Sequence, residues 1–298
     1  SKGPHADEAQ LYLARTHLEQ GELETAGEQL VSLIAGEGKV AARSSLWYAR
    51  VYTRADPADY DRASAILGTA TKAHSESPII NDLRFDYANS LMARTEPSWE
   101  EALASLTLLR AEEDFGQQGE VLSQISVCQQ KLGKNEESLA SNNKFLAEHS
   151  EHRLVAEARF MKAENLFVLG RRDEASKSYA AFLDAHTDHP NCLAATFRQA
   201  QIHHAEGRWA ECIETSAAIV AADPKESLYD QLPFMIGDSL FRQEKWEQAV
   251  EPLSKFLSKR VTTSDEETTV KTGANVDTAL IQLAVCHDRG GRKEAALA

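Results

Sequence analysis

Two pairs of histidines have the spacing best suited to chemistry. His149 and His152 form a His-x-x-His pair, and His186 and His189 repeat it 37 residues later. Such a pair can ligate a metal ion between neighbouring segments. An internal repeat would also produce the recurrence, because equivalent positions in duplicated units keep similar residues. We favour this structural interpretation and expect no metal and no cofactor.

The four cysteines are dispersed, without the spacing of metal ligands. Cys128 and Cys286 stand beside apolar neighbours, and Cys212 stands where equivalent segments carry alanine. We therefore expect buried thiols that act as small hydrophobic groups. Four unpaired thiols also favour a reducing compartment.

Sequence motifs of catalysis are missing. The chain has no Gly-x-Ser-x-Gly, no phosphate-binding glycine-rich loop, no Cys-x-x-Cys and no His-Glu-x-x-His. We therefore predict that the chain is not an enzyme. The formal net charge of -14 argues against a nucleic-acid partner. No apolar run reaches the roughly 18 residues of a membrane span.

An internal repeat organises the whole chain. One small residue recurs at intervals of 37, 39, 36, 37, 37, 37 and 47 residues. A period of this length predicts an array of stacked repeats. The recurring residues are Ala26, Ala63, Ala102, Ser138, Ala175, Cys212, Ala249 and Ala296.

Each repeat is predicted to be two helices joined by a tight turn. Ala175, Tyr179 and Phe182 fall on one helical face, at i, i+4 and i+7. Gly170 precedes that helix, at a position suited to the left-handed conformation that ends a helix; Gly21, Gly133 and Gly207 are its equivalents. Pro190 separates one hairpin from the next, because proline does not fit inside a helix.

These residues resemble the tetratricopeptide repeat family. Its pattern combines a small residue in the first helix, a glycine-aromatic turn and an alanine in the second helix. The matching residues are Ala163, Ala200 and Gly237, then Trp209 and Trp246, then Ala175 and Ala249. The resemblance implies an all-α fold, a right-handed α-solenoid of about eight stacked helix-turn-helix units in a single array over residues 1–298. The units are predicted at 6–40, 43–77, 81–115, 118–152, 155–190, 192–224, 229–260 and 277–298.

Residues 182–190 are similar to the subtype of this family found in bacterial envelope proteins, such as the Tol-Pal coordinator and the outer-membrane assembly lipoprotein. That likeness implies the periplasm or cell envelope of a bacterium. The cytoplasm is the alternative, since the unpaired cysteines favour it.

Two irregularities interrupt the array. The fourth repeat carries Ser138 and Asn142 where apolar residues are expected, so we predict a bend or a soft point there. The polar insertion at 261–277 accounts for the 47-residue interval and is either a mobile loop or a contact arm, the loop being favoured.

The resemblance also implies where a partner binds, because first helices line the concave wall in this family. The corresponding residues are Phe160, Glu164, Phe167, Phe197, Gln201, His204, Phe234, Asp238 and Phe241. They predict a ladder of aromatic rings with polar side chains between them, suited to a peptide. The alternative is that the rings pack between adjacent helices. The lysine and two asparagines that grip acidic chaperone tails are absent, which disfavours such tails. The acidic residues on the wall favour a neutral or basic partner.

The predicted function is a non-catalytic protein-protein interaction scaffold that binds a partner protein or peptide on its concave face. One alternative is the recruiting or regulatory arm of a larger enzyme, since the last helix stops unfinished. Another is an architectural spacer that self-associates.

Overall fold

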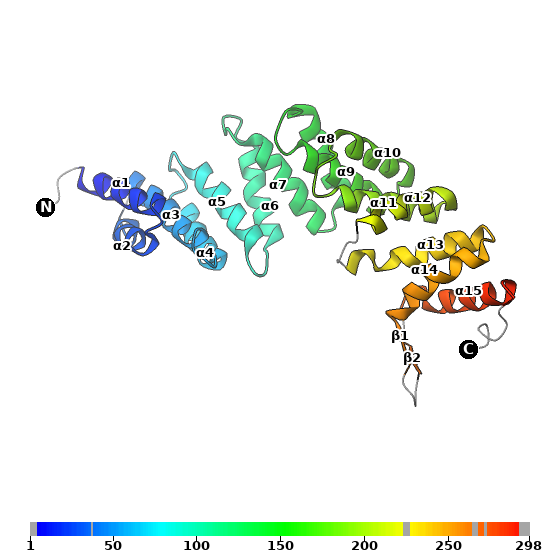
Figure 1. Cartoon of the computed structure of the whole chain (residues 1–298). Helices are drawn as coiled ribbons and strands as arrows, with labels where there is room; N and C mark the ends of the chain where they lie inside the picture. Colours follow the sequence, from blue (N-terminus) through cyan, green and yellow to red (C-terminus); the bar gives the residue numbers. More distant parts are fainter. Residues whose placement is uncertain (1–4, 37, 223–226, 264–267, 271–272, 292–298) are drawn as a thin grey trace. The chain divides into compact units, whose positions relative to one another are not determined.

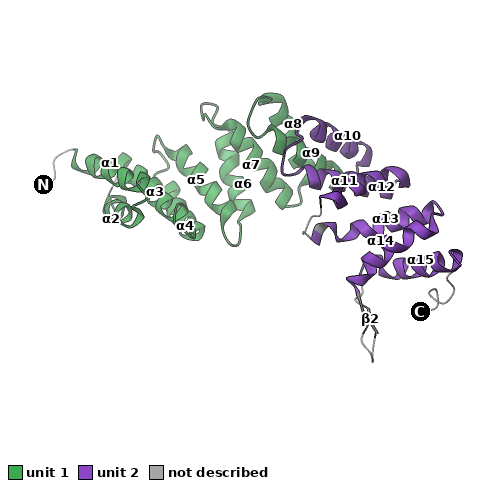
Figure 2. Cartoon of the chain, viewed as in Figure 1, with its two compact units in different colours: residues 1–169 green, residues 170–298 purple. Residues whose placement is uncertain are grey.

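The computed structural model describes residues 5–36, 38–222, 227–263, 268–270 and 273–291 (Figure 1). The chain divides into two compact units, residues 1–169 and residues 170–298 (Figure 2). Consecutive helices pack against one another within each unit. The prediction of a single continuous array concerns how the two units are joined, and it stays a prediction.

The first unit is a series of helical hairpins. Each first helix packs on the second helix of its own hairpin and on that of the hairpin before it. The helices are α1 (Ala6–Glu19), α2 (Leu23–Ile34), α3 (Gly38–Thr53), α4 (Tyr60–Ala73), α5 (Ile80–Ala93), α6 (Trp99–Arg110), α7 (Gln118–Lys131), α8 (Asn135–Glu148) and α9 (Val155–Val168).

The second unit continues the same pattern and adds a short β-hairpin. Its elements are α10 (Arg172–Ala185), α11 (Cys192–Ala205), α12 (Trp209–Ala221), the 3₁₀ turn η1 (Ser227–Gln231), α13 (Leu232–Arg242), α14 (Trp246–Ser258), β1 (Val261–Thr263), β2 (Thr268–Val270) and α15 (Val276–Arg289). The two strands pair antiparallel, with Val261 opposite Val270. The predicted polar insertion therefore contains regular structure.

The recurring small residue is the point of closest helix packing. Seven of the eight predicted positions are described, and all seven are fully buried on the second helices. A small side chain there lets two helix backbones approach closely, which explains the regular spacing of the residue. The eighth, Ala296, lies outside the described residues.

Glycine forms the turn inside four of the hairpins, as the sequence predicts. Gly21, Gly133, Gly170 and Gly207 all have positive φ, from +71° to +81°. A side chain makes this left-handed backbone conformation unfavourable. Glycine has no Cβ atom and adopts it without a steric clash. The turn between α13 and α14 places Glu244 in the same conformation, at φ +58°.

The boundary between the first two hairpins differs from its predicted place. The sequence put the break between residues 40 and 43, but α3 begins at Gly38. Gly38 itself has φ +80°, so the chain changes direction at this glycine. The apolar pattern alone did not mark the break, because Val40, Ala41 and Ala42 fit either side of it.

Candidate functional site

The first helices of the hairpins form an inner layer within each unit. α1 contacts α3 and α3 contacts α5 in the first unit; α11 contacts α13 and α13 contacts α15 in the second. No contact of similar extent joins two second helices in the part of the chain that the structure describes. The first helices are therefore the more closely spaced layer, and we call their outward surface the first-helix face.

Two of the predicted wall phenylalanines belong to the core. Phe197 is 1% exposed and packs with Ala200, Cys212 and Ile219. Phe234 is 5% exposed, and its ring centre lies 5.3 Å from that of Phe256 on α14. The alternative interpretation, that the rings pack between adjacent helices, describes these two residues.

The remaining predicted wall residues are divided between the two units. Phe160, Glu164 and Phe167 lie half-buried on α9 in the first unit. Gln201 and His204 on α11 and Phe241 on α13 are half-buried in the second, and Asp238 is buried. The structure brings His204 and Asp238 together, since the Nε2 atom of His204 lies 2.9 Å from the Oδ2 atom of Asp238.

Asp238 ties three first helices together. Its carboxylate contacts His204 from α11 and accepts a hydrogen bond from Gln282 of α15, while Arg242 donates from 3.3 Å within α13. Burial by itself raises the pKa of Asp238. The hydrogen bonds from His204 and Gln282 and the charge of Arg242 outweigh burial and hold the pKa below its ordinary value. Both carboxylate oxygens are engaged, so this buried group is structural.

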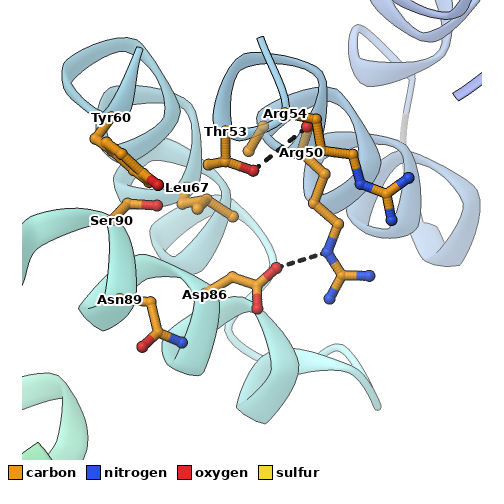
Figure 3. Close-up of a pocket in the computed structure, with 9 residues that line it drawn as sticks. Arg50, Thr53, Arg54, Tyr60, Leu67, Asp86, Asn89 and Ser90 are labelled. Atoms are coloured by element: carbon orange, nitrogen blue, oxygen red, sulfur yellow. Dashed lines mark hydrogen bonds and ion pairs between the residues drawn. The ribbon is translucent and has the colours of Figure 1, made fainter. Parts of the chain in front are cut away.

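A hollow of about 260 Å³ opens between α3, α4 and α5 in the first unit (Figure 3). We call it the first-helix hollow. Its lining residues are Ala49, Arg50, Thr53, Arg54, Tyr60, Leu67, Asp86, Asn89 and Ser90. Polar side chains of α3 and α5 line it on both sides of the apolar Leu67 of α4 (Figure 3).

Ion pairing makes the first-helix hollow close to neutral but leaves it rich in hydrogen-bond donors. The Nε atom of Arg50 donates to Asp86 over 2.7 Å. The Nη groups of Arg50 have no hydrogen-bond partner among the described residues. Asn89 accepts a hydrogen bond from Gln124 through Oδ1, and its Nδ2 group is likewise unpartnered within the described chain. The hollow can therefore hold carbonyl oxygens.

The charge of Arg50 also acts on a neighbouring carboxyl. Burial raises the pKa of Asp82, and the nearby Asp86 raises it further, while the positive charge of Arg50 opposes both. The arginine thus offsets negative charge at the edge of the hollow.

The sequence contains a signal for this hollow that the predicted site missed. Ala49 and Ala88 are fully buried first-helix residues, like Ala163. The next residues, Arg50 and Asn89, therefore hold the position that Glu164, Gln201 and Asp238 hold in later repeats. Carrying the repeat register back to the first hairpins would have identified them. It would also have shown that this position is not acidic throughout.

The repeated histidines stabilise the turn that follows a second helix. In both copies a phenylalanine packs against histidines four and seven residues later, with ring centres 5.3 to 5.5 Å apart. The Nδ1 atom of the last histidine accepts the backbone N–H two residues on, over 3.2 Å. The copies are Phe145, His149 and His152, then Phe182, His186 and His189. These contacts support the structural interpretation.

The thiols of Cys128, Cys212 and Cys286 are buried. Burial raises the pKa of each, that of Cys128 to about 11, and so keeps them protonated. Within the described segments, no three histidine, cysteine or acidic side chains are arranged to hold a metal. None of the described helices has the length and apolar character to cross a membrane.

Comparison with known proteins identifies the repeats. A family model described as tetratricopeptide repeat matches residues 160–227. Residues 160–227 therefore match the tetratricopeptide repeat. No curated protein matches it in sequence. Solved tetratricopeptide structures extend the likeness in fold beyond the matched segment.

Three solved structures show the breadth of that likeness. A tetratricopeptide repeat protein from Parabacteroides merdae is 17% identical, with a TM-score of 0.56 over 86% of this chain and 89% of its own. PilW, a type IV pilus biogenesis factor, is 15% identical, with a TM-score of 0.55 over 74% and 95%. A MamA protein is 15% identical, with a TM-score of 0.50 over 60% and 91%. At such identities the likeness concerns the fold.

The predicted fold class is confirmed: the chain is a solenoid of tetratricopeptide-type helical hairpins, with one short β-hairpin added. The tetratricopeptide fold is in general that of a protein-protein interaction scaffold. The narrower likeness to envelope proteins stays a prediction.

Proposed function

We propose that the chain is a non-catalytic scaffold that binds a partner protein along the first-helix face of its N-terminal unit. The observation that carries the proposal is the first-helix hollow, in which N–H groups of Arg50 and Asn89 lack a hydrogen-bond partner among the described residues and lie near the apolar Leu67. An extended peptide presents carbonyl oxygens and side chains that match such a surface. Because Asp86 offsets the charge of Arg50 and Glu19 offsets that of Arg54, a neutral peptide suits this site.

Capture experiments with a matched pair of variants test the proposal. Asn89→Leu fills the hollow and removes an amide donor, whereas Asn143→Leu makes the same change at an exposed position of α8. The immobilised chain and both variants are exposed to native lysate of the source cells, and retained proteins are quantified by mass spectrometry. We expect Asn89→Leu to retain the specific partner about tenfold less well, as loss of an interface anchor does.

The control variant decides whether the effect is local. Asn143→Leu is expected to retain the partner as the unmodified chain does, and circular dichroism should give equal helicity for all three proteins. Equal retention by Asn89→Leu and Asn143→Leu would exclude the first-helix hollow as the binding site. Failure of the unmodified chain to retain any protein would contradict the scaffold itself.

A further inference from the structure

Helix α3 presents a second surface on the side away from the first-helix hollow. Successive residues of an α-helix are turned by about 100°. Ala49, Arg50 and Thr53 therefore share one side of α3, while Tyr48 and Tyr52 share the opposite side. The second set lines a separate hollow against α2.

This second hollow, which we call the α2–α3 hollow, has a volume of about 360 Å³. Its lining residues are Leu23, Glu24, Gly27, Glu28, Val31, Tyr48, Val51, Tyr52 and Ala55. They combine an apolar floor, two tyrosine rings and two carboxylates.

The apolar floor is open because Gly27 has no side chain. A Cβ atom built on Gly27 would lie 3.8 Å from both Tyr48 and Val51, which is an ordinary contact distance. Val31, one turn further along α2, is 47% exposed. Apolar surface is thus accessible within the hollow.

The two tyrosines form a compact aromatic pair. Their ring centres lie 5.3 Å apart at an interplanar angle of 83°, and the Tyr52 hydroxyl donates to that of Tyr48 over 2.9 Å. The guanidinium carbon of Arg62 lies 4.5 Å from the centre of the Tyr52 ring. The Tyr52 ring thus already makes a cation–π contact with Arg62. The Tyr48 ring can make the same kind of contact with a cationic group of a ligand.

Two carboxylates at the rim of the α2–α3 hollow have no positively charged partner among the described residues. Glu24 and Glu28 lie one turn apart on α2, and both are exposed. Neither has a hydrogen bond or an ion pair with any described residue. They outnumber the single positive charge of Arg62, so the rim attracts cations.

We propose that the α2–α3 hollow binds a cationic amphipathic helix of a partner protein. A lysine or arginine of that helix lays its alkyl stem on Leu23 and Val31 and brings its charge to Glu24, Glu28 and the Tyr48 ring. Long basic side chains have this dual character, an apolar stem and a charged end. The site lies apart from the first-helix hollow, so the N-terminal unit has a docking surface for a second, basic partner.

Binding of defined peptides to the full chain tests this proposal. The probe is a fluorescein-labelled alanine-based helical peptide with leucine and lysine along one face, and its reference replaces every lysine by glutamine. Fluorescence anisotropy at low salt measures the dissociation constants. We expect the lysine peptide to bind about tenfold more tightly than the glutamine peptide, from the combined ion-pair and cation–π contacts.

Two variants change the hollow in different ways. Glu24→Lys combined with Glu28→Lys reverses the charge of the rim and should weaken lysine-peptide binding about tenfold or more. Gly27→Leu keeps the charge but fills the hollow, at a position where a Cβ atom meets its neighbours at ordinary contact distances, and should weaken binding to a similar degree. Circular dichroism confirms that each variant keeps its helicity.

The chain contains a closely matched control. Glu247 and Glu251 hold the same positions relative to Ala249 on α14 that Glu24 and Glu28 hold relative to Ala26 on α2. In that repeat Val250 stands where Gly27 stands. Glu247→Lys combined with Glu251→Lys changes the net charge equally and should alter binding by less than about twofold.

Three results would overturn the proposal. Equal binding of the lysine and glutamine peptides would indicate an apolar ligand. Equal weakening by the two charge-reversed pairs would indicate general electrostatic attraction by the chain. Unchanged binding to Gly27→Leu would place the peptide outside the hollow.

Discussion

Buried polar side chains distinguish the fourth repeat at the scale of single residues. Ser138 is fully buried, but it donates to the Ser126 carbonyl and accepts from Asn165, each over 2.8 Å. Asn142 is 1% exposed, and neither its amide nitrogen nor its amide oxygen has a hydrogen-bond partner in the structure. The weak packing predicted for this repeat therefore concerns Asn142, whereas the buried hydroxyl of Ser138 is hydrogen-bonded.

Asn142→Leu should stabilise the protein. Leu30, Leu67 and Leu106 hold the equivalent position in the first three repeats, and all three are buried. Removing an unsatisfied buried amide is expected to raise the free energy of unfolding by about 1–2 kcal/mol in urea titration. The exposed Asn143→Leu should change it by less than about 0.5 kcal/mol. A destabilised Asn142→Leu would show that the amide has a partner.

At the scale of helices, the Asp238 carboxylate is a tie between α11, α13 and α15. Three side chains from these helices converge on one buried group. The hydrophobic effect that drives the packing of helix faces is non-directional. A charged group with fixed hydrogen-bond donors adds a defined register.

This tie predicts a pH-dependent stability. The pKa of Asp238 is lower in the folded protein than in the unfolded chain, where it is about 3.9. Its contribution is therefore complete well above that unfolded value and is lost as the pH falls through the folded value. Asp238→Asn should lower the free energy of unfolding by about 1–3 kcal/mol at pH 7, and by progressively less between pH 5 and pH 3.

Urea unfolding across that pH range measures the effect. Asp184→Asn is the control, because Asp184 is exposed on α10 and should contribute little at any pH. A difference between Asp238→Asn and the unmodified chain that stays constant from pH 7 to pH 3 would contradict the charge-based tie.

At the scale of the whole molecule, stability is distributed along the chain. Within each unit a helix contacts mainly its nearest neighbours in sequence. The stability of such an array approximates a sum of local terms, so damage stays local. Both proposed binding surfaces lie in the first unit, on two sides of α3.

Phe197→Ala tests the local character of stability. Phe197 is a large buried residue of the second unit, and its truncation should cost about 3–5 kcal/mol locally. Hydrogen exchange should accelerate in α11, α12 and α13 and stay unchanged in α1 to α5. The reciprocal variant, Leu83→Ala in the core of the first unit, should give the reverse pattern. Acceleration throughout the chain in either variant would instead indicate one cooperative unit.

Much of the fold was predictable because it depends on local spacing. The small-residue series located the second helices, and the glycine turns adopted the expected left-handed backbone. The β-hairpin was not predicted, since the short polar segments around Thr262 and Thr269 carry no distinctive pattern. The start of α3 at Gly38 was not evident either, because the apolar residues that follow it fit either side of the break.

The candidate site was predicted only in part. The repeat register placed Phe197 and Phe234 correctly on first helices but did not show that both rings are buried. The predicted site did not include Arg50 and Asn89, because it was defined by the aromatic residues of later repeats.

The sequence by itself determined that this chain is an array of helical hairpins, because the repeat period and the small residues fix which helix faces meet. Only the tertiary structure decided which side chains are left to a partner. Arg50 and Asp86 are 36 residues apart and meet across two helices, and Gly27 opens a hollow only because Tyr48 and Tyr52 stand opposite it. Exposure depends on how neighbouring helices fill the space between them, and residue spacing alone does not contain that information.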